Sequence, residues 1–191
     1  YPLQGQDLSK ADAILAVEET LVKHDGAQNH NWHGVTFEYA TWLRPMQGAG
    51  YVEAQTGACD ICPYGVELQD GCGKHDTFVV APGNVVVSGG RNVEFVNCSY
   101  QHLGAYAASA LNGSQNVSWR GCTFQDVSAG AVALGDVTTW DISDTSRWDK
   151  DFVVEDCLIA NLPVEYTGAA AVFGGYVDSA TIAHNHIANT T

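Results

Sequence analysis

Residues 116–127 read NVSWRGCTFQDV, and residues 92–103 read NVEFVNCSYQHL. In both segments an aromatic residue is followed three positions later by cysteine, and a second aromatic residue stands two positions beyond the cysteine. A phrase that recurs after 24 residues predicts a solenoid, in which each repeat forms one coil that packs against the next coil.

Three further segments align with these two, at residues 29–40, 151–162 and 179–190. The copies are spaced by 63, 24, 35 and 28 residues. The first apolar position is occupied by Trp32, Phe95, Trp119, Val154 and Ile182. The central position is occupied by Val35, Cys98, Cys122, Cys157 and Asn185, and the last by Phe37, Tyr100, Phe124, Ile159 and Ile187.

The spacing of these positions favours two short strands separated by a bend, because residues i, i+3 and i+5 do not share one face of an α-helix. Runs of small residues follow three of the copies, as GAYAASAL, SAGAVALG and TGAAAVFGG, and indicate a further buried strand. We therefore predict an all-β chain, with residues 1–191 forming one parallel β-helix whose coils lie about 4.8 Å apart.

Stacking of the coils brings cysteines at the central position within the Cα separation that a disulfide tolerates. Cys98, Cys122 and Cys157 are therefore candidates either for one disulfide between neighbouring coils or for a column of buried thiols. The sequence does not distinguish these alternatives.

Two segments are longer than a coil requires and are predicted to leave the β-helix as loops, near residues 43–78 and 135–151. The first contains Cys59, Cys62 and Cys72, for which a local disulfide is favoured over a zinc site with His75 as fourth ligand. Residues 9–22 combine a helix-like start with β-branched spacing, and we favour strand.

The net charge of −14 argues against nucleic acid and anionic membranes as partners, since both require a cationic face. No apolar run approaches the length of about 20 residues that a membrane helix needs. Glycosylation sequons begin at Asn97, Asn112, Asn116 and Asn189 and, with six cysteines, indicate a secreted, extracellular protein carrying N-linked glycans. The last repeat ends at the end of the sequence, so we expect the β-helix to continue in further coils of a longer chain.

The segments GVTFEYATWLRP, GYVEAQTG, GCTFQDVSAGAVALGDV and VEYTGAAAVFGGYVDSATIAHNHI resemble the right-handed parallel β-helix proteins of the pectate-lyase-like superfamily. Among these proteins, the chain looks like secreted β-helix proteins related to glycoside hydrolases. The resemblance extends over most of residues 29–188 and implies a right-handed β-helix acting on a polysaccharide.

Hydrolysis of a glycosidic bond requires two carboxyl groups, and stacked coils place side chains at separations that suit such a pair. Asp136 and Glu165 are the first candidates because each lies beside a predicted buried strand. Asp141 and Glu53, on the insertions, are second choices. Any one of these acids is also compatible with a solvated loop position.

Flat aromatic side chains that suit stacking on a sugar ring are Trp42, Trp140, Trp148, Tyr51 and Tyr166, and each also suits core packing. His184 and His186 stand on either side of Asn185, but two ligands do not make a metal site. We predict no metal and no cofactor.

Two functions follow from this pattern. One is binding or cleavage of an extracellular polysaccharide, with glycoside hydrolysis as the reaction. The alternative is a non-catalytic subunit of a filament, cell wall or surface assembly, because the ends of a β-helix offer strands for self-assembly. A lyase acting on a polyuronate is disfavoured, since the chain has only eight Lys and Arg residues.

Overall fold

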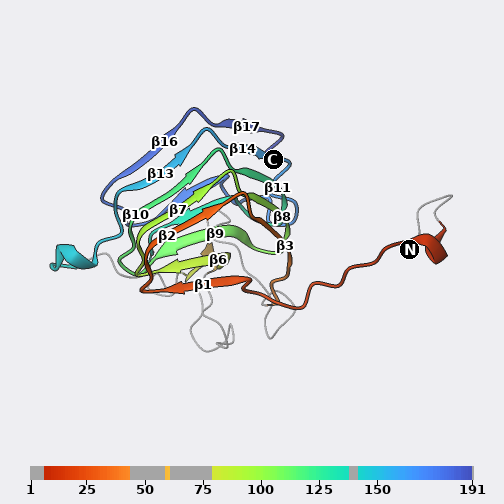
Figure 1. Cartoon of the computed structure of the whole chain (residues 1–191), viewed down its shortest axis with the longest axis horizontal. Helices are drawn as coiled ribbons and strands as arrows, with labels where there is room; N and C mark the ends of the chain where they lie inside the picture. Colours follow the sequence, from red (N-terminus) through yellow and green to blue (C-terminus); the bar gives the residue numbers. More distant parts are fainter. Residues whose placement is uncertain (1–6, 44–58, 61–78, 138–141, 191) are drawn as a thin grey trace.

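The computed structural model describes residues 7–43, 59–60, 79–137 and 142–190. In these residues the chain forms the predicted right-handed parallel β-helix, with three parallel sheets of five strands each along its length (Figure 1). Each coil contributes one strand to each sheet, so the five coils lie one above another. No helix in this part of the chain is long and apolar enough to cross a membrane.

Sheet A contains β1 (Val22–Asp25), β6 (Gly83–Ser88), β9 (Tyr106–Leu111), β12 (Val132–Leu134) and β15 (Val172–Gly174). Sheet B contains β2 (Gln28–His33), β7 (Arg91–Val96), β10 (Gln115–Arg120), β13 (Phe152–Glu155) and β16 (Ala180–Ala183). Sheet C contains β3 (Thr36–Ala40), β8 (Ser99–Leu103), β11 (Thr123–Val127), β14 (Leu158–Ala160) and β17 (His186–Ala188). The short strands β4 (Cys59–Asp60) and β5 (Val79–Val80) pair antiparallel outside these sheets.

The register predicted from the repeat is confirmed at both apolar positions. In sheet B the paired residues run Trp32, Phe95, Trp119, Val154 and Ile182. In sheet C they run Phe37, Tyr100, Phe124, Ile159 and Ile187. The small-residue runs supply β9, β12 and β15 of sheet A, as predicted.

Aromatic side chains at these two positions stack inside the β-helix. Phe95 and Trp119 lie with ring centroids 5.5 Å apart and planes at 5°, and Tyr100 and Phe124 lie 4.6 Å apart at 12°. All four side chains are fully buried. Stacked rings in a buried interior contribute both buried area and a favourable ring–ring contact.

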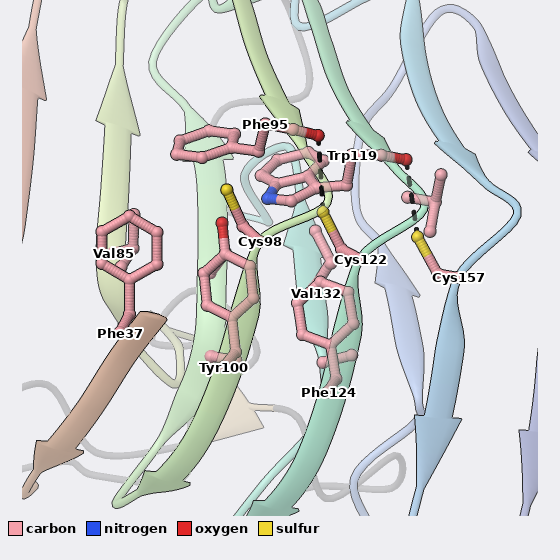
Figure 2. Close-up of a cluster of buried hydrophobic side chains, with 14 of the residues drawn as sticks. Phe37, Val85, Phe95, Cys98, Tyr100, Trp119, Cys122, Phe124, Val132 and Cys157 are labelled. Carbon is pink, nitrogen blue, oxygen red and sulfur yellow. Dashed lines mark hydrogen bonds between the residues drawn. The ribbon is translucent and has the colours of Figure 1, made fainter. Parts of the chain in front are cut away.

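The central position forms a column of buried free thiols, Cys98, Cys122 and Cys157, which is the second of the two alternatives that the sequence left open (Figure 2). Each thiol donates to a carbonyl instead: Cys122 Sγ lies 3.4 Å from the oxygen of Phe95, and Cys157 Sγ lies 3.6 Å from the oxygen of Trp119. The interaction with the Cys157 thiol, together with burial, raises the pKa of the Cys122 thiol, so it stays protonated. Small thiols fill the narrow interior and satisfy a backbone acceptor without a cross-link.

The corners between sheets repeat a left-handed backbone conformation from coil to coil. Two columns of such residues have φ between 52° and 66°. One consists of Asn29, Asn92, Asn116 and Asp151, and the other of Gly34, Asn97, Gly121, Asp156 and His184. Only Gly, and less readily Asn and Asp, adopt this conformation at low energy. The corners therefore explain why Asn, Asp and Gly recur at fixed places in the repeat.

Asparagines at one corner also bond to each other along the column. The amide of Asn92 donates to Asn29 Oδ1 at 2.9 Å and accepts from Asn116 Nδ2 at 2.8 Å. All four sequon asparagines occupy left-handed corner positions of this kind. Their abundance thus has a structural cause that is independent of glycosylation.

The prediction of strand over residues 9–22 is wrong except at Val22, where β1 begins. A short 3₁₀-helix, η1 (Leu8–Lys10), is followed by an extended segment that leads away from the sheets (Figure 1). Leu15 in this segment is 85% exposed. A strand needs a neighbour for its backbone hydrogen bonds. The hydrogen bonds given for this segment with the β-helix lie at its end, where the Glu18 carbonyl accepts from Thr41 N at 2.9 Å and Leu21 N donates to the Asn84 carbonyl at 2.8 Å.

Most of the insertion predicted near residues 43–78 lies outside the described residues, including Cys62, Cys72, His75 and the candidates Tyr51 and Glu53. Of its cysteines only Cys59 is described, as part of the backbone of β4. Its disulfide and zinc alternatives therefore stay predictions.

We expect Asn92→Ala to destabilise the protein by about 2 kcal/mol, because alanine is strained at φ 55° and the asparagine ladder is interrupted. Asn92→Gly removes only the ladder and should cost about 1 kcal/mol. Urea unfolding midpoints measure both effects. Equal destabilisation by the two substitutions would show that the left-handed corner imposes no penalty.

Candidate functional site

A pocket of about 420 Å³ lies at the corner between sheets A and B. Three carboxyl groups line it, and we call it the carboxylate pocket. Its residues are Asn112, Gly113, Asp136, Ile142, Arg147, Trp148, Asp149, Tyr176, Val177 and Asp178. The volume is in the range of small-ligand sites in proteins.

The pocket is built at the carboxyl ends of three neighbouring strands of sheet A. Gly113 follows β9, Asp136 follows β12, and Tyr176 follows β15. The backbones are held together by hydrogen bonds such as that from Tyr176 N to Asp136 O, at 2.8 Å. Gly175 is required here, because a Cβ atom at this position would lie 2.4 Å from the same carbonyl oxygen.

One wall of the pocket is the segment 142–149, which contains the 3₁₀-helix η4 (Thr145–Arg147). Asp144 caps this helix by accepting from the amide and the hydroxyl of Ser146. Within the segment, Trp148 Nε1 donates to the carbonyl of Ile142 at 2.7 Å. The wall is therefore internally organised, although it projects from the body of the β-helix (Figure 1).

Side chains from the outer face of sheet B anchor this wall. Gln115 Nε2 donates to the carbonyls of Ser146 and Trp148, each at 3.0 Å. Arg91 Nη2 donates to the Ser146 carbonyl at 2.7 Å. Gly113 lets the wall approach closely, since a Cβ there would lie 2.9 Å from the carbonyl oxygen of Arg147.

Asp149 is the buried carboxyl of the pocket, with 8% of the residue exposed. Its Oδ1 accepts from the backbone amides of Gly113 at 3.1 Å and Ser114 at 2.9 Å. Burial raises the pKa of Asp149 to about 6, the two amide hydrogen bonds oppose the shift, and the negative charge of Asp136 adds to it. A carboxyl group tuned in this way holds a proton in mildly acidic solution and can donate it.

Asp136 is half-buried, and its Oδ1 accepts from the amide of Val137 at 2.6 Å. Tyr176 is 52% exposed and Trp148 is half-buried, so both offer ring surface at the pocket. Asp136 and Asp149 therefore line one pocket beside aromatic surface, and glycoside hydrolysis uses both kinds of group.

The structure does not bring Asp136 and Glu165 into one pocket. Glu165 N donates to Ser128 O, which precedes β12, whereas Asp136 follows that strand. Glu165 therefore lines a different pocket, of about 290 Å³, at the opposite ends of the sheet A strands.

The predicted aromatic residues have several environments. Trp42 and Tyr166 meet edge to face with ring centroids 5.3 Å apart, and both pack against buried residues such as Tyr106 and Ala133. Trp42 also lines the smaller pocket, together with Glu165. Trp148 lines the carboxylate pocket. Trp140 and Asp141 lie outside the described residues.

Three residues of the carboxylate pocket, Asp149, Tyr176 and Asp178, were not among the predicted site residues. The repeat itself contains the signal for Asp149. If residue 151 lies over Asn116, then Asp149 lies over Ser114, at the corner where Asp136 was expected.

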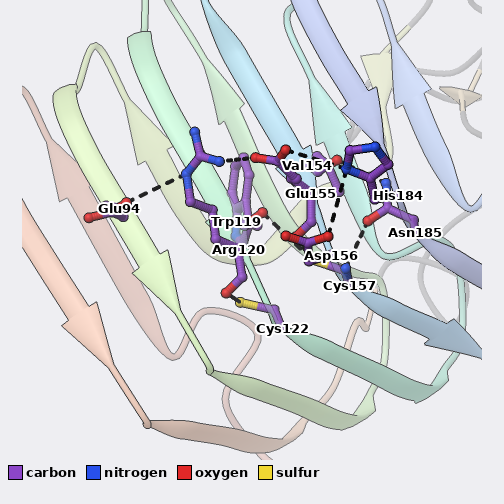
Figure 3. Close-up of polar contacts among 10 residues, drawn as sticks. All are labelled: Glu94, Trp119, Arg120, Cys122, Val154, Glu155, Asp156, Cys157, His184 and Asn185. Carbon is purple, nitrogen blue, oxygen red and sulfur yellow. Dashed lines mark hydrogen bonds and ion pairs between the residues drawn. The ribbon is translucent and has the colours of Figure 1, made fainter.

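A row of charged side chains lies along sheet B and its corner, and none of them lines either of the two pockets described above (Figure 3). Arg120 pairs with Glu155 and, with Nε 3.7 Å from Oε1, with Glu94. His184 Nδ1 lies 3.7 Å from Glu155 and 3.8 Å from Asp156. Such exposed pairs stabilise a protein only weakly. Across the described ranges, no three His, Cys, Asp or Glu side chains are grouped so that they could hold a metal ion.

No family model and no curated protein sequence matches the chain. A solved structure described as a glycoside hydrolase has the same fold, with a TM-score of 0.81 at 22% sequence identity. The match covers 100% of this chain and 35% of that chain, so this chain spans about a third of the length of that protein. At this identity the similarity shows the fold alone, and the narrower resemblance to the pectate-lyase-like superfamily stays a prediction.

We expect the unfolding free energy of Asp149→Asn to increase, relative to that of the wild type, as the pH rises. The pKa of Asp149 is raised from 3.8 to about 6, so between these values the unfolded chain has lost a proton that the folded protein still binds. Wild-type stability therefore falls across this window, by an amount on the order of 2 kcal/mol. Asparagine removes this loss and still accepts from the two amides.

The difference in unfolding free energy between Asp149→Asn and the wild type, measured in urea at pH 4 and at pH 7, tests this expectation. Asp156→Asn, at an exposed corner outside the pocket, is the matched control. A difference that does not change with pH would contradict the raised pKa.

Proposed function

We propose that the carboxylate pocket hydrolyses glycosidic bonds, with Asp149 as the general acid and Asp136 as the second carboxyl group. The observation that carries this proposal is the buried carboxyl of Asp149, whose pKa is raised to about 6 in a pocket shared with Asp136. Glycoside hydrolases use one protonated and one ionised carboxyl group, and differences in environment produce the two states.

In the proposed reaction, Asp149 donates its proton to the oxygen of the scissile glycosidic bond as that bond breaks. Asp136, as the carboxylate, either removes a proton from an attacking water molecule or attacks the anomeric carbon itself. The backbone amides of Gly113 and Ser114 then stabilise the carboxylate that remains on Asp149. In the inverting case, the proton that Asp136 takes from water replaces the one that Asp149 has lost, once the two groups exchange protons with solvent. In the retaining case, the Asp149 carboxylate takes a proton from the water that hydrolyses the glycosyl ester on Asp136, which restores both carboxyl groups.

The proposed substrate is an uncharged polysaccharide. The pocket has three carboxyl groups and a single basic side chain, Arg147, so an anionic sugar such as a uronate would be repelled. Tyr176 and Trp148 suit the apolar face of a pyranose ring. The solved structure with the same fold is described as a glycoside hydrolase, which supports this class of reaction. Secretion is part of the proposal and is supported by the sequons and cysteines of the sequence.

We expect Asp149→Asn to lower kcat on an uncharged polysaccharide by about 100- to 10,000-fold, because the proton donor is lost while the turn hydrogen bonds are kept. In the wild type, kcat/KM should fall as the pH rises above about 6, where Asp149 loses its proton. Reducing-end release from a panel of glucans, xylans and mannans measures both quantities.

Asp156→Asn is again the control and should keep wild-type activity. An Asp149→Asn variant that is folded and fully active would exclude Asp149 as the acid.

A second candidate function is structural, and the outermost coil favours it. Ile182 is 51% exposed and Ile187 is 47% exposed, although the residues below them in the same columns, Val154 and Ile159, are fully buried. This apolar edge suits another coil, either a further coil of the same chain or a coil of a second chain in a filament or surface array.

In a filament, Ile187→Asp should abolish concentration-dependent association, because a charge would be placed at the apolar edge. Sedimentation velocity over a range of protein concentrations measures this. Thr181→Asp, on the neighbouring strand of the same coil, is the control. A wild-type chain that stays monomeric would remove the structural candidate.

A further inference from the structure

The smaller pocket lies at the opposite ends of the sheet A strands from the carboxylate pocket. It has a volume of about 290 Å³ and lies where the strands of sheet C end and the next strands of sheet A begin. We call it the corner pocket. Its polar and aromatic lining consists of Thr41, Trp42, His102, Asp126, Ser128 and Glu165. The reaction proposed above uses none of these residues.

The corner pocket contains a histidine that is fixed from two sides. His102 Nδ1 lies 2.5 Å from Asp126 Oδ2, which belongs to the coil above and stands in register with it. The ring of Tyr39, from the coil below, stacks on the imidazole with centroids 5.0 Å apart and planes at 13°. The side chains of His102 and Asp126 are 43% and 54% exposed, so a ligand can reach both of them.

This column has an unusual composition for its backbone. Tyr39, His102 and Asp126 have φ of 61°, 55° and 52°. At equivalent left-handed corners the chain uses mainly Asn, Asp and Gly, which adopt this conformation more readily than Tyr or His. The corner therefore keeps an aromatic ring and an imidazole at a position where smaller residues would be more stable.

The chemistry of the lining suits sugar hydroxyl groups, which both donate and accept hydrogen bonds. Asp126 and Glu165 accept, the hydroxyls of Thr41 and Ser128 do both, and Trp42 adds an aromatic wall. The two carboxyl groups disfavour phosphate and uronate ligands. Glu165 is exposed at the rim, and its amide is anchored to Ser128 O at 3.1 Å.

We propose that the corner pocket is a second, non-catalytic binding site for an uncharged glycan. The proposal rests on the proposed function for its substrate class. With one binding site at each end of the sheet A strands, the chain would hold a polysaccharide at the corner pocket while cleavage takes place at the carboxylate pocket.

The test uses isothermal titration calorimetry on the full chain carrying Asp149→Asn. The ligands are uncharged trisaccharides of glucan, xylan and mannan. We expect two bound trisaccharides per chain. Adding His102→Asn, which tolerates the left-handed corner but lacks the imidazole, should reduce the number to one. Glu165→Gln changes an exposed side chain without disturbing the fold of the corner, and it should lower the affinity of the corner pocket for the trisaccharide. Asp156→Asn should leave two sites.

The proposal would be overturned if a folded His102→Asn protein still bound two trisaccharides and the Glu165→Gln protein bound them with the affinity of the parent. Failure of every trisaccharide to bind would overturn it as well. If the wild type cleaves no polysaccharide but His102→Asn removes one bound trisaccharide, the proposed hydrolysis fails and the corner pocket stands.

Discussion

The hydrogen bonds between successive coils determine which residues meet in this protein. Because each strand pairs in parallel with the strand one coil away, a side chain lies directly over its equivalents at the strand spacing of about 4.8 Å. The aromatic stacks, the thiol column and the asparagine ladder are three consequences of that one constraint. A shift of one residue in a coil would move the aromatic residues of that coil to the wrong face of their strands.

The register is maintained only because each coil can turn at the same places. Left-handed residues at the corners let short strands change direction without a long loop, which is why Asn, Asp and Gly recur there. The same demand places asparagine at left-handed corner positions, two residues before positions that carry serine or threonine. Asn116 followed by Ser118 satisfies both the corner and the sequon, so sequons in a β-helix of this kind are weaker evidence for secretion than in an irregular fold.

The sequence predicts those parts of the structure that repeat and fails on those that do not. The alignment of Trp119 over Phe95 and of Phe124 over Tyr100 follows from periodicity, so the fold and register could be derived before any coordinates. Residues 9–22 have strand-like composition but lack a neighbouring strand, which composition cannot reveal. The separation of Asp136 from Glu165 was contained in the sequence, because Asp136 follows the predicted strand SAGAVALG whereas Glu165 precedes the predicted strand TGAAAVFGG. Coil spacing alone, on which the pair was chosen, does not distinguish the two ends of a strand.

The carboxyl group of Asp149 is the strongest sign that the carboxylate pocket has a function beyond folding. The turn at Gly113 and Ser114 needs only an acceptor for two amides, and an asparagine oxygen would supply one without a charge. Burial instead raises the pKa of the Asp149 carboxyl group to about 6, so folding disfavours its ionised form. The second acid, Asp136, increases that penalty, although the coil could place a neutral residue there. Two acids that destabilise each other in one pocket are difficult to explain by stability, and proton transfer to a bound substrate is the chemistry for which such a pair is suited.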